Sequence, residues 1–214
     1  MSPYFLLLAE ITTEVSASRE TNMKPKYINK WIHAQCTRKK VLLLMKMPLT
    51  ANQIGLKLNM NSAKCSRILQ DFSIKGLAIC LNPGARMSRL YDLTAQGRQC
   101  QEQICIELNI PLKTIHKISA DWGLYGWICF RHRSSVIKIL TEPMQPSEMK
   151  RKLLRRDSSV NISSNNIRDI IKLFKIRGIV TKVYDKKKVH PLYELSDTGK
   201  KLYKLLIMEK TVTN

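Results

Sequence analysis

Hydrogen-bonding side chains recur along one side of residues 62–70, where the apolar residues have helical spacing. The apolar side of this predicted helix consists of Cys65, Ile68, Leu69 and Phe72. The opposite side combines small and donor side chains, namely Ser62, Lys64, Ser66, Arg67 and Gln70. Small residues permit close approach to a groove of nucleic acid, and lysine, arginine and glutamine reach base edges and phosphate oxygens. A solvated helix has a similar composition, so its neighbours must decide between the two interpretations.

A basic loop between two short apolar segments follows this helix. Residues 77–81 and 89–93 have the composition of two strands, and the loop between them has the sequence Asn-Pro-Gly-Ala-Arg-Met-Ser. Arg86 lies in this loop and Arg89 directly follows it. Arginines on a hairpin can contact phosphates or the minor groove. A polar helix next to a basic hairpin favours the binding of duplex nucleic acid over a plain solvated surface.

The same arrangement occurs twice in the chain. Residues 72–78 (FSIKGLA) match residues 174–180 (FKIRGIV), and residues 90–98 (LYDLTAQGR) match residues 192–200 (LYELSDTGK). Both matches have an offset of 102 residues. A repeat at one offset in sequence of ordinary complexity indicates an internal duplication. We therefore expect two domains with the same architecture.

The duplication and the charge distribution predict the domain organisation. Residues 24–110 and 122–214 form the two predicted domains, 111–121 a connector, and 1–23 an N-terminal extension. The chain of 214 residues carries a net charge of +21, with +11 in residues 24–106, +12 in residues 122–214, 0 in residues 107–121 and −2 in residues 1–23. Positive charge on two folded parts favours a polyanionic partner.

The second copy repeats the polar helix at residues 163–174 with a different outward side. This side consists of Ser164, Asn165, Asn166 and Arg168. Asparagine pairs well with adenine and arginine with guanine, whereas Asp169, at the position of Arg67, would repel phosphate. Seven additional residues around 154–160 lengthen the turn before this helix. The second hairpin contains the consecutive lysines Lys186, Lys187 and Lys188, which predict a phosphate-contacting loop or a solvated turn; the adjacent Asn and Arg side chains favour the former.

Further helices should support these elements. One long or broken first helix is predicted from the spacing of Tyr27, Trp31, Ala34, Val41, Leu42 and Met45. Thr50 and Gln53 have capping-box spacing at the start of a helix over 51–58. Helices over 98–109 and 199–209 carry apolar stripes, the first formed by Ile104, Cys105 and Leu108. We expect the first stripe to contact either the second repeat or another subunit, so these two helices could form a homodimer.

Each half resembles the winged helix-turn-helix domain of prokaryotic regulators such as the MarR and ArsR families, which is also widespread in archaea. The resemblance rests on Thr50–Leu58, Ser62–Phe72, Lys75-Gly76-Leu77, Leu90–Thr94 and Gly97-Arg98, together with their second-copy counterparts. It covers most of residues 37–106 and 130–206. It implies a mainly α fold with small β-hairpin wings (α+β), two tandem domains, and sequence-specific binding of double-stranded DNA. By this resemblance Ser62, Lys64, Ser66 and Arg67 face the major groove, and Arg86 and Arg89 lie on the wing.

The sequence gives little support to an enzyme or a metal protein. His33, His116, His132 and His190 have no carboxylate or cysteine neighbour at catalytic spacing, so we expect no catalytic residues. The six cysteines lack metal-ligand spacing, so we expect no metal and no cofactor, and free thiols favour a cytoplasmic location. Cys65 has the periodicity of an inert buried residue rather than of a redox switch. No apolar run approaches the length of a membrane span.

A transcriptional regulator bound to the chromosome is the main interpretation. A replication or plasmid-type initiator and an architectural DNA-binding protein are the nearest alternatives, and binding of duplex or loop RNA comes next. A scaffold that binds other proteins through tandem domains is the alternative from another class. The net charge of +21 opposes the scaffold. Effector pockets in this fold have no sequence signature, so the sequence does not decide whether the protein binds a small-molecule effector.

Overall fold

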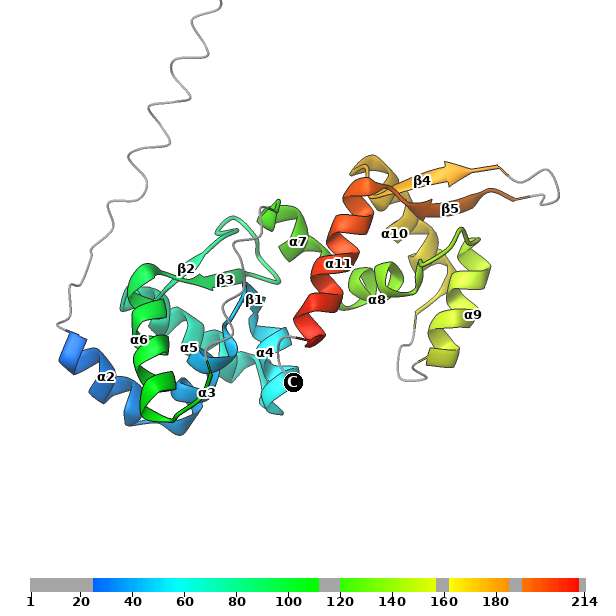
Figure 1. The fold of residues 1–214 in the computed structure, drawn as a ribbon. Helices are drawn as coiled ribbons and strands as arrows, with labels where there is room; N and C mark the ends of the chain where they lie inside the picture. Colours follow the sequence, from blue (N-terminus) through cyan, green and yellow to red (C-terminus); the bar gives the residue numbers. More distant parts are fainter. Residues whose placement is uncertain (1–24, 112–119, 157–161, 185–189, 212–214) are drawn as a thin grey trace, which may run out of the picture. The chain divides into compact units, whose positions relative to one another are not determined.

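The structure, a computed structural model, describes residues 25–111, 120–156, 162–184 and 190–211 (Figure 1). These residues are mainly helical with two small antiparallel sheets, which confirms the expected α+β class. The chain divides into two compact units. Among the described residues, the first unit contains 25–80 and 91–111, and the second contains 81–90 and 120–211.

The first unit contains the elements that its sequence predicts, in the expected order, together with one short strand, β1, that was not predicted. The helices are α2 (Pro25–His33), α3 (Cys36–Leu44), α4 (Ala51–Leu58), α5 (Ser62–Ile74) and α6 (Ala95–Glu107). The strands are β1 (Leu49–Thr50), β2 (Ala78–Cys80) and β3 (Leu90–Leu93), which form one sheet in the order β1-β3-β2. Strands β2 and β3 are antiparallel, with Ala78 opposite Leu93.

The predicted first helix is broken, and the buried side of its first half differs from the prediction. Gln35 has an extended backbone and separates α2 from α3. Ile28 and Ile32 are fully buried, whereas Tyr27 is 61% exposed. Trp31 is half-buried and Ala34 is exposed, so the expectation of a buried side with these residues is wrong. The prediction for the second half is confirmed, because Val41, Leu42 and Met45 are all buried.

The start of α4 and the tight turn that follows it have local causes in the sequence. The Thr50 hydroxyl accepts a hydrogen bond from the Gln53 backbone N–H, and the Gln53 side chain accepts one from the Thr50 N–H, which confirms the capping box. Asn59 ends α4 in the left-handed region (φ +50°), and Asn61 caps α5 by accepting from the Ala63 N–H at 2.7 Å. The two helices therefore follow each other across a very short turn.

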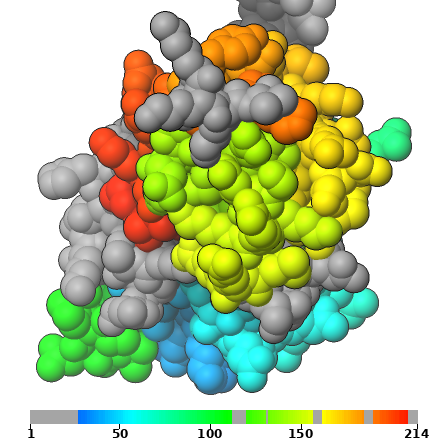
Figure 2. All heavy atoms as spheres, turned by 90° about the vertical axis from the view of Figure 1, so that its right-hand side faces the viewer, coloured from blue at the N-terminus to red at the C-terminus, as the bar shows by residue number. Residues whose placement is uncertain are grey.

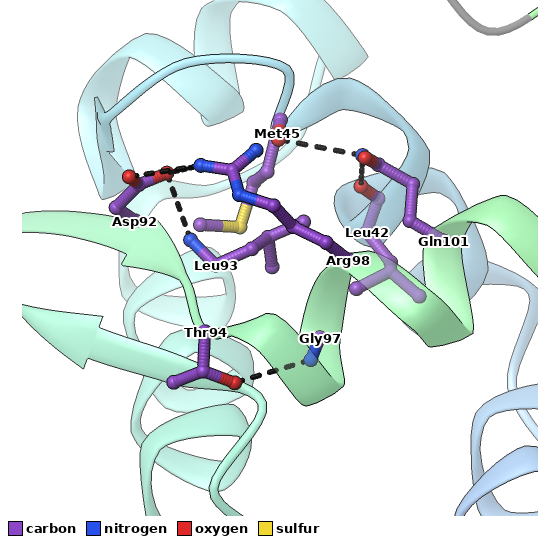
Figure 3. Close-up of polar contacts among 8 residues, drawn as sticks. All are labelled: Leu42, Met45, Asp92, Leu93, Thr94, Gly97, Arg98 and Gln101. Atoms are coloured by element: carbon purple, nitrogen blue, oxygen red, sulfur yellow. Dashed lines mark hydrogen bonds and ion pairs between the residues drawn. The ribbon is translucent and has the colours of Figure 1, made fainter. Parts of the chain in front are cut away.

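Helix α6 begins three residues earlier than predicted, at Ala95, because the Thr94 side chain caps it. The Thr94 hydroxyl accepts from the Gly97 N–H at 3.1 Å (Figure 3). It also donates to the Gly76 carbonyl at 2.5 Å. Gly76 ends the hydrogen-bonded turn after α5 with φ +70°. This single hydroxyl joins the start of α6 to the end of the preceding helix. A Cβ at Gly97 would overlap the Leu77 carbonyl oxygen, so glycine is needed at this crossing.

Most of the apolar stripe of α6 is covered within the first unit. Buried Gln101 donates from Nε2 to the Leu42 carbonyl at 2.6 Å and to the Met45 carbonyl at 3.3 Å (Figure 3). Helix α6 packs on α3, and Ile104 and Cys105 are buried, so these two stripe residues need no other repeat or subunit to cover them. Leu108, the third residue of the stripe, is 44% exposed, and a homodimer through α6 and α11 stays a prediction.

The second unit repeats this order of elements. Its helices are α7 (Trp122–Ile128), α8 (Arg131–Ile139), α9 (Pro146–Arg156), α10 (Ser164–Ile176) and α11 (Asp197–Thr211), and its strands are β4 (Val180–Val183) and β5 (Leu192–Leu195). Strands β4 and β5 are antiparallel, with Val180 opposite Leu195. Met144 forms an isolated bridge to Tyr193 before α9, where the first unit has β1.

Several contacts of the first unit recur in the second at equivalent positions. Gly178 has φ +65°, and the Ser196 hydroxyl accepts from the Gly199 N–H and donates to the Gly178 carbonyl, as Thr94 does in the first unit. A Cβ at Gly199 would overlap the Ile179 carbonyl oxygen. The repetition of these detailed contacts supports the internal duplication inferred from the sequence. Helix α11 packs on α8, and its stripe is buried at Leu202, Leu205 and Leu206.

Candidate functional site

The outward side of α5 is exposed as the sequence predicts. Lys64, Arg67 and Gln70 are exposed, as is Ser62, and Ser66 is half-buried. The inward side, Cys65, Ile68, Leu69 and Phe72, is buried. Within the part of the chain that the structure describes, neither Lys64 nor Arg67 forms an ion pair. Both cations on α5 are therefore available to an anionic partner.

The close packing of α4 against α5 presents this surface. A Cβ at Gly55 would lie 2.7 Å from the Met60 carbonyl oxygen and 3.4 Å from the Ser62 backbone nitrogen. The Met60 N–H in turn donates to the Gly55 carbonyl at 2.8 Å. The absence of a side chain at Gly55 lets the chain turn back closely, so that α5 starts directly against α4 with its polar side outward.

The hairpin loop that carries Arg86 and Arg89 is held together by Asn82. The Asn82 side chain accepts from the Leu90 N–H at 2.7 Å and donates to the Ser88 carbonyl at 3.2 Å. Arg89 donates from Nε to the Ala85 carbonyl at 3.1 Å. Both arginines are exposed, and their loop belongs to the second compact unit.

The outward side of α10 is also exposed, but its polar groups interact with one another. Asn165, Asn166 and Arg168 are exposed, and Ser164 is half-buried. Arg168 donates from Nη1 to Asn165 Oδ1 at 3.3 Å, and Asp169 forms an ion pair with Lys172 at 3.7 Å. The proposed base-reading groups of α10 are thus partly satisfied by neighbours on the same helix. Lys186, Lys187 and Lys188 lie outside the described residues.

A hollow of about 480 Å³ lies beside α10 in the second unit. Arg168, Lys172 and Lys175 line it from α10, His190 and Tyr193 from the hairpin, and Pro146 and Ser147 from the start of α9. Sequence analysis missed Lys172, Lys175 and His190 as members of this surface. The spacing of Arg168, Lys172 and Lys175, four and then three residues apart, already placed them on one side of α10.

Each unit contains a tryptophan covered by the protein's own cations. The Arg38 guanidinium lies 3.9 Å from the Trp31 ring centroid and the Lys75 ammonium lies 4.8 Å from it. In the second unit Trp127 has Arg133 at 4.0 Å and Arg177 at 4.3 Å. Burial, and then the charge of Arg177, lowers the pKa of Arg133. These rings already contact cations of the chain, which makes them poor platforms for stacking unpaired bases.

The cysteines of the described residues are free thiols. Cys65 is fully buried, and burial raises its pKa, although the neighbouring Lys64 charge acts in the opposite direction. Burial also raises the pKa of Cys100 and of Cys105. A raised pKa lowers the thiolate fraction, so these side chains act as small apolar residues of the core.

Metal sites and membrane spans are the remaining classes of site. The described residues contain no group of three or more His, Cys, Asp or Glu residues that could hold a metal ion. None of the helices within this part of the chain is long and apolar enough to cross a membrane. Comparisons with known protein families, with curated proteins and with solved structures find no match for the chain.

Proposed function

We propose that the chain binds double-stranded DNA and acts as a transcriptional regulator, with each half a winged helix-turn-helix domain. The observation that carries the proposal is the exposed side of α5, on which Lys64, Arg67 and Gln70 project from a helix whose opposite side is buried. A helix in the major groove requires such a side, with small residues for close approach and donors that reach base edges.

The order of elements in each unit supports the winged-helix interpretation. In the first unit a helix and a short strand precede α4 and α5, and the hairpin of β2 and β3 precedes α6. The short strand joins the hairpin in the sheet order β1-β3-β2. The second unit has the same order, with Met144 bridged to Tyr193 in place of β1. An exposed polar helix and a basic hairpin each suit a duplex, with the hairpin on the backbone or in the minor groove.

The charge of the chain supports a polyanionic partner in the same way. The net charge is +21, and both halves are strongly basic. Neutralisation of phosphates by Lys and Arg supplies sequence-independent affinity that weakens as salt rises. Base contacts from α5 would add the sequence preference that a regulator needs. On this proposal the protein acts where the chromosome is, in the cytoplasm of a prokaryotic cell.

The proposal is tested by binding the purified protein to a random pool of duplex DNA at low and at moderate salt, with duplex RNA as competitor. A selected DNA motif that survives the higher salt supports a regulator or an initiator, and the spacing of its half-sites shows whether both halves bind. Binding without a motif supports an architectural protein instead. Failure to bind DNA refutes the proposal and favours the protein scaffold, and preference for the RNA competitor favours an RNA-binding protein.

A further inference from the structure

We infer that the second unit binds the DNA backbone mainly through α9, over a surface that consists of Lys138, Arg151, Lys152, Arg155 and Arg156, the α9 surface. This inference rests on the proposed function, because it names where duplex DNA contacts the second unit. The residues of the α9 surface lie outside the polar sides of α5 and α10 and outside both hairpins.

The charge of α9 differs from that of its counterpart in the first copy. The 11 residues of α9 include five Lys or Arg and one Glu, whereas the eight residues of α4, its counterpart, include one Lys and no acid. Helix α9 is longer by three residues, Leu154–Arg156, which are part of the seven-residue insertion predicted from the sequence. The rest of this insertion lies outside the described residues. The additional turn thus brings Arg155 and Arg156 into the second copy.

These side chains line two adjoining hollows rather than projecting separately. One hollow, of about 380 Å³, is lined by Lys138, Lys152, Arg155 and Arg156, and the other, of about 600 Å³, by Arg151, Lys152 and Arg155 together with Glu142 and Glu148. Lys152 and Arg155 line both. Figure 2 shows this side of the second unit, with α9 in yellow-green and α10 in yellow beside it. The concave basic surface could follow a row of phosphates.

Contacts within the unit fix part of this surface and leave part of it available. Arg156 donates from Nη1 to the Lys138 carbonyl at 3.0 Å, and Lys152 is paired with Glu142 at 3.2 Å. Arg151 and Arg155 are exposed, and neither forms an ion pair among the residues that the structure describes. Arg151 and Arg155 can therefore neutralise phosphates without first breaking an ion pair, and Lys152 and Arg156 beside them are held in place.

Helix stability alone does not account for this charge. Basic residues in the last turn interact favourably with the helix dipole, which explains Arg155 and Arg156. It does not explain Arg151, and like charges four residues apart, as in Arg151 and Arg155, destabilise a helix. The acid in α9, Glu148, accepts a hydrogen bond from the Gln145 N–H at 2.8 Å at the opposite end. An external polyanion would relieve the repulsion.

The neighbouring helix α10 is less suited than α5 to hold the duplex. Arg168 is bonded to Asn165, and Asp169 occupies the position at which the first copy has Arg67. A carboxylate there repels phosphate, and the adjacent α9 surface supplies the attraction that α10 lacks. Contacts to phosphate carry no base information. The second unit would therefore contribute affinity and register, while α5 contributes sequence preference.

The test compares two double variants that each remove two positive charges from the second unit. R151Q/R155Q changes the α9 surface, and K201Q/K204Q changes exposed lysines of α11 as a matched control. Affinity for duplex DNA is measured by fluorescence anisotropy over a series of salt concentrations. Because each phosphate contact contributes about 0.9 to the slope of log affinity against log salt, R151Q/R155Q should flatten the slope by about 1.8 on every sequence. K201Q/K204Q should leave it unchanged.

The outcomes separate this inference from the proposed function. An unchanged slope for R151Q/R155Q, with tight binding by the wild-type protein, overturns the inference and leaves the proposed function in place. An equal flattening in K201Q/K204Q also overturns it, because net charge rather than the α9 surface is then responsible. Absence of wild-type binding overturns both. The charge-conserving R151K/R155K should retain the slope, and R151Q alone should flatten it by about 0.9, if the double variant does not fold.

Discussion

Replacement of Gly97 by alanine should destabilise the first unit severely, although alanine is the better helix former. Gly97 lies in the first turn of α6, where the helix crosses the end of α5 and the hairpin strand β2. A Cβ there would overlap the Leu77 carbonyl oxygen and would lie 3.0 Å from the Leu77 carbonyl carbon and 3.2 Å from Leu93 Cδ2. The first neighbour is backbone, so rotation of a side chain cannot relieve the overlap.

The expected loss in free energy of unfolding follows from three contributions. Overpacking against rigid neighbours costs up to about 3 kcal/mol. The Leu77 carbonyl also accepts from the Thr94 N–H at 3.0 Å, and displacing it loses a hydrogen bond worth about 1 kcal/mol. Better helix propensity returns at most about 1 kcal/mol. Gly97→Ala should therefore lower the stability of the first unit by about 3 kcal/mol, the sum of the three.

Urea unfolding followed by far-ultraviolet circular dichroism measures this loss. Gly84→Ala is the matched control, because a Cβ at Gly84 has no described heavy atom within 4 Å and it should change stability by less than about 0.5 kcal/mol. Gly199→Ala should repeat the effect in the second unit, where the Ile179 carbonyl occupies the place of Leu77. If Gly97→Ala is as stable as Gly84→Ala, the first turn of α6 does not lie as close to the Leu77 carbonyl as the structure places it.

Three further outcomes follow from the site. Arg67→Ala should cost about 1–3 kcal/mol of binding free energy on a selected DNA motif and relax the base preference at one position of that motif. Binding to single-base variants of the motif measures this preference, and an unchanged preference would show that α5 does not read bases. Replacing Lys186, Lys187 and Lys188 together should weaken binding to all sequences alike and flatten the salt slope by up to about 2.7, and an unaltered slope would remove the second hairpin from the interface. At pH 8 a thiol reagent should modify exposed Cys36 quickly and buried Cys65 only when the protein unfolds, because burial raises the pKa of Cys65 and lowers its thiolate fraction; peptide mapping by mass spectrometry distinguishes the two, and rapid native modification of Cys65 would contradict the buried position.

The elements that could be predicted from the sequence are those with local causes. The apolar spacing within α5 and α10 identified every buried residue on their inner sides, because one straight helix keeps a constant phase. Thr50 and Gln53 identified the start of α4 because a capping box lies within four residues. The constant offset of 102 residues between the matching segments indicated two copies of one architecture.

The predictions that failed depend on structure beyond one segment. The buried side of α2 was misassigned because Ile28 and Ile32 have the same four-residue spacing as Tyr27 and Trp31, and only packing against the rest of the unit decides between the two sides. The contact of α6 with α3, including the hydrogen bond from Gln101 to the Leu42 carbonyl, was not predicted because the two helices are far apart in sequence. The charge of α9 was visible as a run of basic residues, but its concave arrangement depends on Lys138 and the end of α8. Packing between distant segments decides these features.

The tryptophans with cations over their rings give each half of the chain an optical reporter of its own. Trp31 lies edge-on to Phe72 at 6.0 Å, and Trp127 lies edge-on to Phe174 at 6.0 Å, so each indole reports on the packing of α5 or α10. The third indole, Trp122, packs against Tyr125. A variant in which Trp122 and either Trp31 or Trp127 are replaced by phenylalanine retains one tryptophan, so its tryptophan fluorescence comes from one half of the chain alone. Its fluorescence spectrum then follows the unfolding of that half, and the half without tryptophan does not contribute. The unfolding of each repeat can therefore be measured separately within a single chain.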